Sequence, residues 1–215
     1  MSIFKLPISE TVEWLCLIVA ILQLRQVTPK YWRSFIAYMS ITILVEVSTY
    51  YISHYTKGNS THWIYNSFLA VYGLFHIWIF AKIIPLAKIN WITSALLILF
   101  LGFYAREWVS QGFNLFFFKT NTLFGIEITF LSLLYFYSLF RQENYVPILK
   151  EPAFWFVTGC LIFYATSSSV NAFFAEILKG NYQIRGIIIT LLNVVMYSCW
   201  IKSFLCFRKN QISTQ

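Results

Sequence analysis

This 215-residue chain contains no aspartate, and charged residues of all kinds make up only 11 % of it. Soluble domains average about 25 % charged residues, so the chain has too few charges to cover a water-facing surface. Apolar residues are abundant instead, with 59 % hydrophobic and 20 % aromatic. The composition predicts an all-α polytopic membrane protein that forms a single transmembrane domain over residues 1–215.

The scarcity of chemical groups excludes most enzyme classes. The acidic set consists of eight glutamates, and histidine occurs three times. No HExxH, Walker A or GxSxG pattern is present, and no pair of residues has metal-ligand spacing. The run Ser167-Ser168-Ser169 lacks the glycine setting of an intramembrane protease and is typical of small residues that let helices pack closely. We therefore predict no enzyme activity, no metal and no cofactor.

Seven apolar segments approach the length of about 20 residues that crosses the hydrocarbon core. They cover residues 12–24, 35–55, 63–84, 89–104, 122–140, 152–178 and 186–207. The fourth is the shortest of the inner ones, and all five prolines lie at or outside the segment ends. The apolar connection 107–120 predicts an interfacial loop, with a lid over the bundle as the alternative.

Basic residues predict the orientation. Ten of the 16 Lys and Arg residues fall on one side if the N-terminus lies outside and the C-terminus in the cytoplasm. Because these residues sit in ones and twos at segment ends, the net charge of +8 indicates membrane topology and not nucleic-acid binding. The expected partner is the lipid bilayer, and the expected location is the cell membrane, with multiple passes. The oligomeric state is left open.

A weak internal repeat emerges when the chain is shifted by 122 positions. Lys57-Gly58-Asn59 then falls on 179–181, Leu69 on Leu191, and Trp78 on Trp200. The order of the matches predicts a 3+1+3 arrangement with parallel repeats. Its halves would be residues 1–84 and 120–207, joined by a connector helix at 89–104.

Polar groups at membrane depth are the candidates for function, because an ionisable group there usually faces the bundle interior or a cavity. We predict a polar pocket in the outer half of the bundle, above an apolar inner half. Its candidate residues are Glu46, Glu127, Asn193, Asn171 and Asn66. Glu13 and Glu176 are expected to be interfacial and solvated. His54 and His76 are possible pH-responsive groups, although a lone His among aromatic residues is more often a core residue than a ligand.

Two segments of the sequence resemble those of a known group of membrane proteins. The pattern Asn-Ser-x-His-Trp-Ile-Tyr-Asn at 59–66 and the segment 152–164, from Pro-Ala-Phe-Trp to Leu-Ile-Phe-Tyr, resemble bacterial seven-helix membrane proteins of uncharacterised function. Some of those proteins are related to the membrane modules of sensor histidine kinases. The resemblance implies a bacterial inner membrane and a sensing role.

We therefore expect a receptor-like membrane protein that senses a ligand or a membrane state in its outer half. It would signal to a separate cytoplasmic partner such as a histidine kinase. A small-solute or proton-coupled transporter using Glu46 is the alternative. A structural subunit of a membrane complex is the third possibility.

Overall fold

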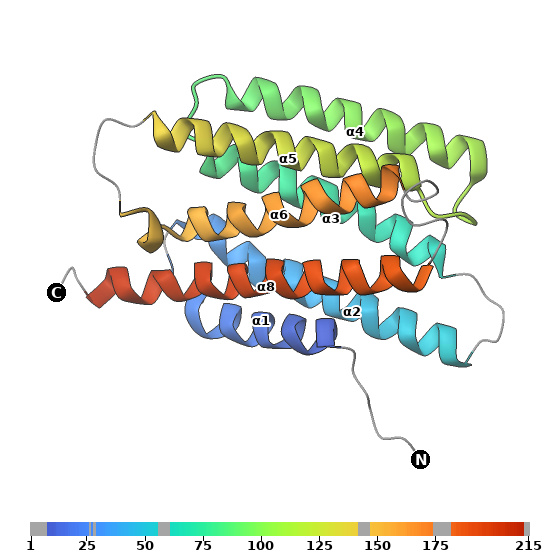
Figure 1. Cartoon of the computed structure of the whole chain (residues 1–215), viewed down its shortest axis with the longest axis horizontal. Coiled ribbons are helices and arrows are strands. Elements are labelled where there is room, and N and C mark those ends of the chain that lie inside the picture. The colour runs from blue at the N-terminus through green and yellow to red at the C-terminus, as the bar shows by residue number, and fades with distance from the viewer. Residues whose placement is uncertain are drawn as a thin grey trace, which may run out of the picture.

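The computed structural model describes residues 8–25, 27, 29–55, 61–141, 147–173 and 182–212. Within these ranges it describes the side chains from Glu10 to Phe207, Tyr182 excepted. The described residues form helices and no strands (Figure 1). The helices are α1 (Ile8–Leu24), η1 (Lys30–Arg33), α2 (Ser34–Tyr55), α3 (His62–Ile83), α4 (Ile89–Gln111), α5 (Phe118–Phe140), η2 (Ile148–Lys150), α6 (Pro152–Ala172) and α8 (Tyr182–Ile212).

Six of these helices are long and apolar enough to cross a membrane, which agrees with the expected multi-pass, all-α class. They are α2 to α6 and α8. With its 17 residues, α1 is the shortest of the described α-helices and extends over only about 25 Å at 1.5 Å per residue. The crossing of α1, and with it the count of seven spans, stays a prediction.

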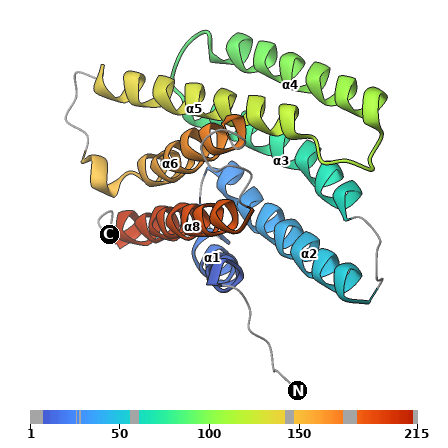
Figure 2. The ribbon, with the colours of Figure 1, turned by 45° about the vertical axis from the view of Figure 1, so that its right-hand side comes forward.

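The described α-helices alternate in direction along the chain, so consecutive ones cross the bundle in opposite directions (Figure 1). One end of the bundle, at which α2 finishes, is called the Tyr55 end. The opposite end, where η1 leads into α2, is called the Arg33 end. In Figure 1, α1 runs from about the middle of the bundle toward the Arg33 end, and α8 finishes at the Arg33 end. Both views place α1 beside α8, with α4 on the far side of the bundle (Figures 1 and 2).

Prolines and glycine delimit several helices, as the sequence predicts for proline. Pro152 occupies the first turn of α6, where its missing N–H costs no helical hydrogen bond. Pro85 follows the last turn of α3, and Pro29 precedes η1. Gly112 ends α4 with a φ of 62°, a left-handed conformation that favours glycine.

The predicted boundaries of two helices were wrong. The fourth helix was expected to stop at residue 104, before the charged Arg106, but α4 continues to Gln111 and has 23 residues. Glu107 is buried within α4 because its carboxylate accepts hydrogen bonds from the first turn of α5, so its charge does not end the helix. The sixth helix was expected to reach residue 178, whereas α6 ends at Ala172.

Small residues allow the closest helix contacts. A Cβ added at Gly159 of α6 would lie 2.9 Å from the Cys199 Cβ and 3.0 Å from the Met196 carbonyl oxygen of α8. A Cβ added at Gly125 of α5 would collide with the Ser168 hydroxyl of α6. The serine run in α6 therefore includes a residue that packs against glycine, the role that the sequence predicts for it.

The residues paired by the predicted repeat do not share an environment. Leu69 is 4 % exposed and Leu191 is 61 % exposed. Trp78 is exposed, whereas Trp200 is fully buried. The two turns that anchor the repeat, 57–59 and 179–181, lie outside the described residues. The 3+1+3 repeat stays a prediction, and these pairs do not support it as a shared packing pattern.

The short connection between α4 and α5 is tied to the bundle at two points. The Asn66 side chain of α3 donates to the Leu115 carbonyl at 2.8 Å and accepts from the Phe117 N–H at 3.1 Å. The Glu107 carboxylate accepts from the N–H of Lys119 at 3.2 Å and from the N–H of Thr120 at 2.8 Å. These two N–H groups belong to the first turn of α5 and have no partner within that helix. The connection is therefore a fixed part of the bundle end.

Replacing Asn66 with alanine is expected to lower the free energy of unfolding by about 1–3 kcal/mol, because the Leu115 carbonyl and the Phe117 N–H lose their partners. Reversible unfolding in mixed micelles, followed by circular dichroism, measures the change. The matched control is Asn90→Ala, since Asn90 is exposed on α4. Equal effects of the two substitutions would contradict the anchoring role.

Candidate functional site

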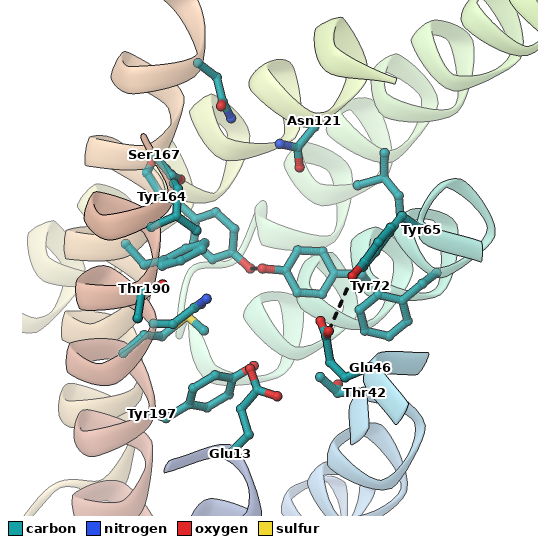
Figure 3. Close-up of a pocket in the computed structure, with 18 of the residues that line it drawn as sticks. Glu13, Thr42, Glu46, Tyr65, Tyr72, Asn121, Tyr164, Ser167, Thr190 and Tyr197 are labelled. Atoms are coloured by element: carbon teal, nitrogen blue, oxygen red, sulfur yellow. Dashed lines mark hydrogen bonds between the residues drawn. The ribbon is translucent and has the colours of Figure 1, made fainter. Parts of the chain in front are cut away.

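A cavity of about 440 Å³ occupies the half of the bundle nearest the Tyr55 end (Figure 3). Residues of α1, α2, α3, α6 and α8 line it, together with Phe116 and Asn121 from the connection to α5 and its first turns. The volume lies within the range of about 300–1,000 Å³ that is usual for small-molecule sites. Several polar side chains from different helices point into it (Figure 3).

Two carboxyl groups face this cavity from neighbouring helices. Glu46 comes from the middle of α2, and the Tyr65 hydroxyl of α3 donates to its Oε2 at 3.4 Å (Figure 3). Glu13 comes from α1, and its carboxyl lies beside the Tyr197 hydroxyl of α8 (Figure 3). Neither carboxyl has an ion-pair partner among the described residues, since the groups that contact them are tyrosine hydroxyls. The site therefore offers acidic groups with neutral partners.

Glu13 is the functional candidate that the sequence interpretation missed. It was expected to be interfacial and solvated, but its residue is buried and its side chain points into the cavity (Figure 3). The spacing of Glu13, Cys16, Ala20 and Leu24 is three, four and four residues, and all four are buried. This spacing marks one face of a helix. Glu13 continues that buried face of α1, and the pattern was available in the sequence.

Amide groups and a guanidinium line another part of the wall. Arg185 of α8 donates from Nη2 to the Asn171 Oδ1 at 2.9 Å and from Nε to the same oxygen at 3.3 Å. Its guanidinium also lies over the Phe118 ring, 5.7 Å from the centroid. Asn193 follows two turns further along α8 and lines the same cavity. This wall is polar and includes one positive charge.

A chain of hydrogen bonds leads from the cavity toward the Arg33 end. The hydroxyls of Tyr72 and Tyr164, which both line the cavity, hydrogen-bond each other (Figure 3). The Tyr164 hydroxyl also bonds the His76 Nε2 at 3.2 Å, and the His76 Nδ1 bonds the Tyr72 carbonyl at 2.9 Å. Because a carbonyl only accepts, Nδ1 carries the proton. In the neutral ring Nε2 then accepts from Tyr164, which in turn accepts from Tyr72.

Between His76 and the Arg33 end, the bundle is filled with aromatic side chains. Six of them, which we call the aromatic floor, are Trp32, Phe35, Phe75, Phe156, Trp200 and Phe204. The Phe35 ring lies 5.0 Å from Phe75, 5.1 Å from Phe156 and 5.7 Å from Trp200 between centroids. Centroid separations of this size are typical of packed aromatic clusters. The cavity is therefore separated from the Arg33 end by a layer of packed rings.

Replacing Tyr164 with phenylalanine is expected to lower the free energy of unfolding by about 1–3 kcal/mol, because the buried His76 Nε2 and Tyr72 hydroxyl lose a common partner. The shape of the ring is kept, so packing changes little. Unfolding in mixed micelles measures the loss. The control is Tyr137→Phe, since Tyr137 is exposed and its hydroxyl accepts a hydrogen bond from the exposed Arg141. A loss of unfolding free energy no larger than that of the control would show that this chain of hydrogen bonds does not stabilise the protein.

Three of the five predicted pocket residues line this cavity and two do not. Glu46, Asn171 and Asn193 line it, from α2, α6 and α8. Asn66 is instead committed to the backbone of the α4–α5 connection. Glu127 is buried on α5 outside the cavity, and within the described part of the chain its carboxyl oxygens have no hydrogen-bond partner.

The two predicted histidines have different positions. His54 is exposed in the last turn of α2, with its ring stacked 5.9 Å from that of Tyr50. His76 is fully buried and belongs to the hydrogen-bond chain beneath the cavity. No group of three or more His, Cys, Asp or Glu side chains among the described residues could hold a metal ion.

Comparisons of the chain with models of protein families, with curated proteins and with solved structures give no match.

Proposed function

We propose that this protein is a receptor-like membrane protein whose cavity binds a small solute. The observation that carries the proposal is a polar cavity in the half of the bundle nearest the Tyr55 end, with the aromatic floor between the cavity and the Arg33 end. A receptor needs access to its site from one side only, and this arrangement provides it, whereas a carrier must also have a second state that is open to the other side. The polar, aromatic lining is typical of solute sites.

In this proposal the Tyr55 end faces outward and the Arg33 end faces the cytoplasm. Exposed basic side chains collect at the Arg33 end, among them Lys82, Lys88, Arg141, Lys150 and Lys202. Such a bias marks the cytoplasmic side of a membrane protein. The same exposed surface is where a separate cytoplasmic partner, such as a histidine kinase, would bind. All seven helices would then cross the bilayer.

Signalling requires two states of the bundle with different affinity for the solute, so filling the cavity must change the Arg33 end. The Tyr72–Tyr164–His76 chain is the proposed link, since it starts at the cavity wall and ends against Trp200 of the aromatic floor, whose ring lies 5.8 Å from that of His76. A solute that displaces either hydroxyl would repack His76 and the floor.

A cavity-filling substitution tests this coupling without any solute. We place spin labels at Lys82→Cys and Lys150→Cys, which are exposed at the Arg33 end, in a background with the four native cysteines replaced by alanine. Asn193→Trp then fills the cavity, and Leu191→Trp, on the exposed face of the same helix, is the control. We expect the distance distribution to shift only with Asn193→Trp. Identical distributions would refute the receptor proposal.

A small-solute or proton-coupled transporter remains the second candidate, because two carboxyl groups that could bind and release protons face the cavity. Uptake by vesicles containing the protein separates the two functions. A receptor moves no solute, with or without a proton gradient. Gradient-driven accumulation that is lost in Glu46→Gln would favour the transporter.

A further inference from the structure

The cavity contains acidic groups that no cation of the described chain neutralises. Glu13 and Glu46 come from different helices and point toward the same space (Figure 3). Glu46 accepts a hydrogen bond from the Tyr65 hydroxyl, and the Glu13 carboxyl lies beside the Tyr197 hydroxyl (Figure 3). Two ionised carboxylates that face the same cavity repel each other, and a cation between them would remove that repulsion.

Arg185 does not supply that cation. Its guanidinium donates from two nitrogens to the Asn171 Oδ1 and lies over the ring of Phe118. Asn171 lies at the end of α6 and Arg185 in the first turns of α8, whereas Glu46 lies near the middle of α2. The positive and acidic groups thus occupy different parts of the cavity wall.

The remaining lining is aromatic, which indicates the chemical class of the ligand. Tyr65, Phe68, Tyr72 and Tyr197 line the cavity beside the two carboxyls. Aromatic faces attract cations, and they attract organic ammonium groups most effectively when carboxylates supply the opposite charge. A bare metal ion would need several converging ligands, and no group of three or more His, Cys, Asp or Glu side chains among the described residues could hold one.

We propose that the cavity binds an organic cation, with its ammonium group between Glu13 and Glu46 and its apolar body against the aromatic wall. The inference rests on the proposed solute-binding role of the cavity and specifies its ligand class. The volume of about 440 Å³ accommodates an amine with an aromatic or branched body. Glu13 and Glu46 select the charge, while Phe68 and the tyrosine rings select the apolar part.

Three probes of nearly the same shape test the charge selection on the unmodified full chain in lipid nanodiscs. They are 3-phenylpropylamine, which is cationic at neutral pH, 3-phenyl-1-propanol, which is neutral, and 3-phenylpropionate, which is anionic. Equilibrium binding is measured by calorimetry. We expect saturable binding of the amine, with the alcohol and the carboxylate at least about tenfold weaker, since a hydrogen bond to a charged group is worth about 1.5–3 kcal/mol.

Isosteric variants identify the residues. Glu13→Gln and Glu46→Gln are each expected to weaken amine binding by about tenfold to a hundredfold. Glu127→Gln, which removes a buried carboxyl outside the cavity, is the matched control and is expected to leave amine binding unchanged. The comparison of the three probes needs no variant, so the proposal stays testable if a variant does not fold.

The outcomes separate this inference from the proposed function. Equal binding of amine and alcohol, or preferred binding of the carboxylate, would overturn the cation inference and leave a solute-binding cavity. Absence of binding for all three probes would also overturn it. Selective, glutamate-dependent amine binding supports it even if the spin-label distances at the Arg33 end do not respond, in which case only the receptor proposal fails.

Discussion

Replacing Phe35 with alanine is expected to lower the free energy of unfolding by about 3–5 kcal/mol. Phe35 is fully buried on α2 at the centre of the aromatic floor. Its ring packs against Trp32 at 5.3 Å and Phe204 at 5.5 Å, as well as against the rings of α3, α6 and α8 named above. Each aromatic pair contributes about 0.5–1.5 kcal/mol, and alanine removes all of them at once while leaving a cavity.

The control for this substitution is Phe140→Ala, because Phe140 is 73 % exposed at the end of α5. Both variants are unfolded reversibly in mixed micelles and followed by circular dichroism. We expect Phe140→Ala to change the free energy of unfolding by less than about 1 kcal/mol, as is usual for exposed sites. Similar losses of unfolding free energy in the two variants would show that the aromatic floor does not depend on close packing of its rings.

Replacing Gly159 with leucine is expected to lower the free energy of unfolding toward the upper end of about 1–3 kcal/mol. The first atom of any side chain at this position already lies 2.9 Å from the Cys199 Cβ and 3.0 Å from a backbone oxygen of α8. A backbone atom cannot rotate away, so α6 and α8 must separate. Association of membrane helices depends on such close contacts, because lipid tails supply no hydrophobic driving force between helices.

Gly102→Leu is the matched control, since a side chain at Gly102 of α4 would meet nothing within 4 Å. In that exposed position leucine is a better helix former than glycine, by up to about 1 kcal/mol. The two glycine substitutions are therefore expected to change stability in opposite directions. A loss of stability in Gly102→Leu as large as in Gly159→Leu would show that contact between α6 and α8 is not the cause.

Hydropathy and proline positions were enough to predict the class and most of the helices. Membrane helices are long apolar runs whose ends carry polar residues and proline, and these signals are local in the sequence. The prediction failed at α4 because Glu107 is polar in sequence but buried in structure, as a hydrogen-bond acceptor for the first turn of α5. A partner supplied by a distant residue cannot be read from local composition.

The rotation of each helix about its own axis, which decides the side chains that face the cavity, was harder to predict from the sequence. A helix between lipid and bundle is apolar on both faces, so periodicity does not indicate which face points inward. Glu46 and Asn193 face the cavity, whereas Glu127 of α5 does not. The tyrosines that contact the acids were also missed, because a sequence rich in aromatic residues does not distinguish Tyr65 or Tyr197 from the others.

The central claim is that a polar cavity is reached from the Tyr55 end and closed to the Arg33 end. Asn193→Cys, in a background without native cysteines, tests it with a membrane-impermeant thiol reagent applied to each side of oriented vesicles. Ser53→Cys and Lys88→Cys, exposed at the Tyr55 and Arg33 ends, report which side is which. We predict that Asn193→Cys is modified only from the side that modifies Ser53→Cys. Modification from both sides, or only from the side of Lys88→Cys, would contradict the account.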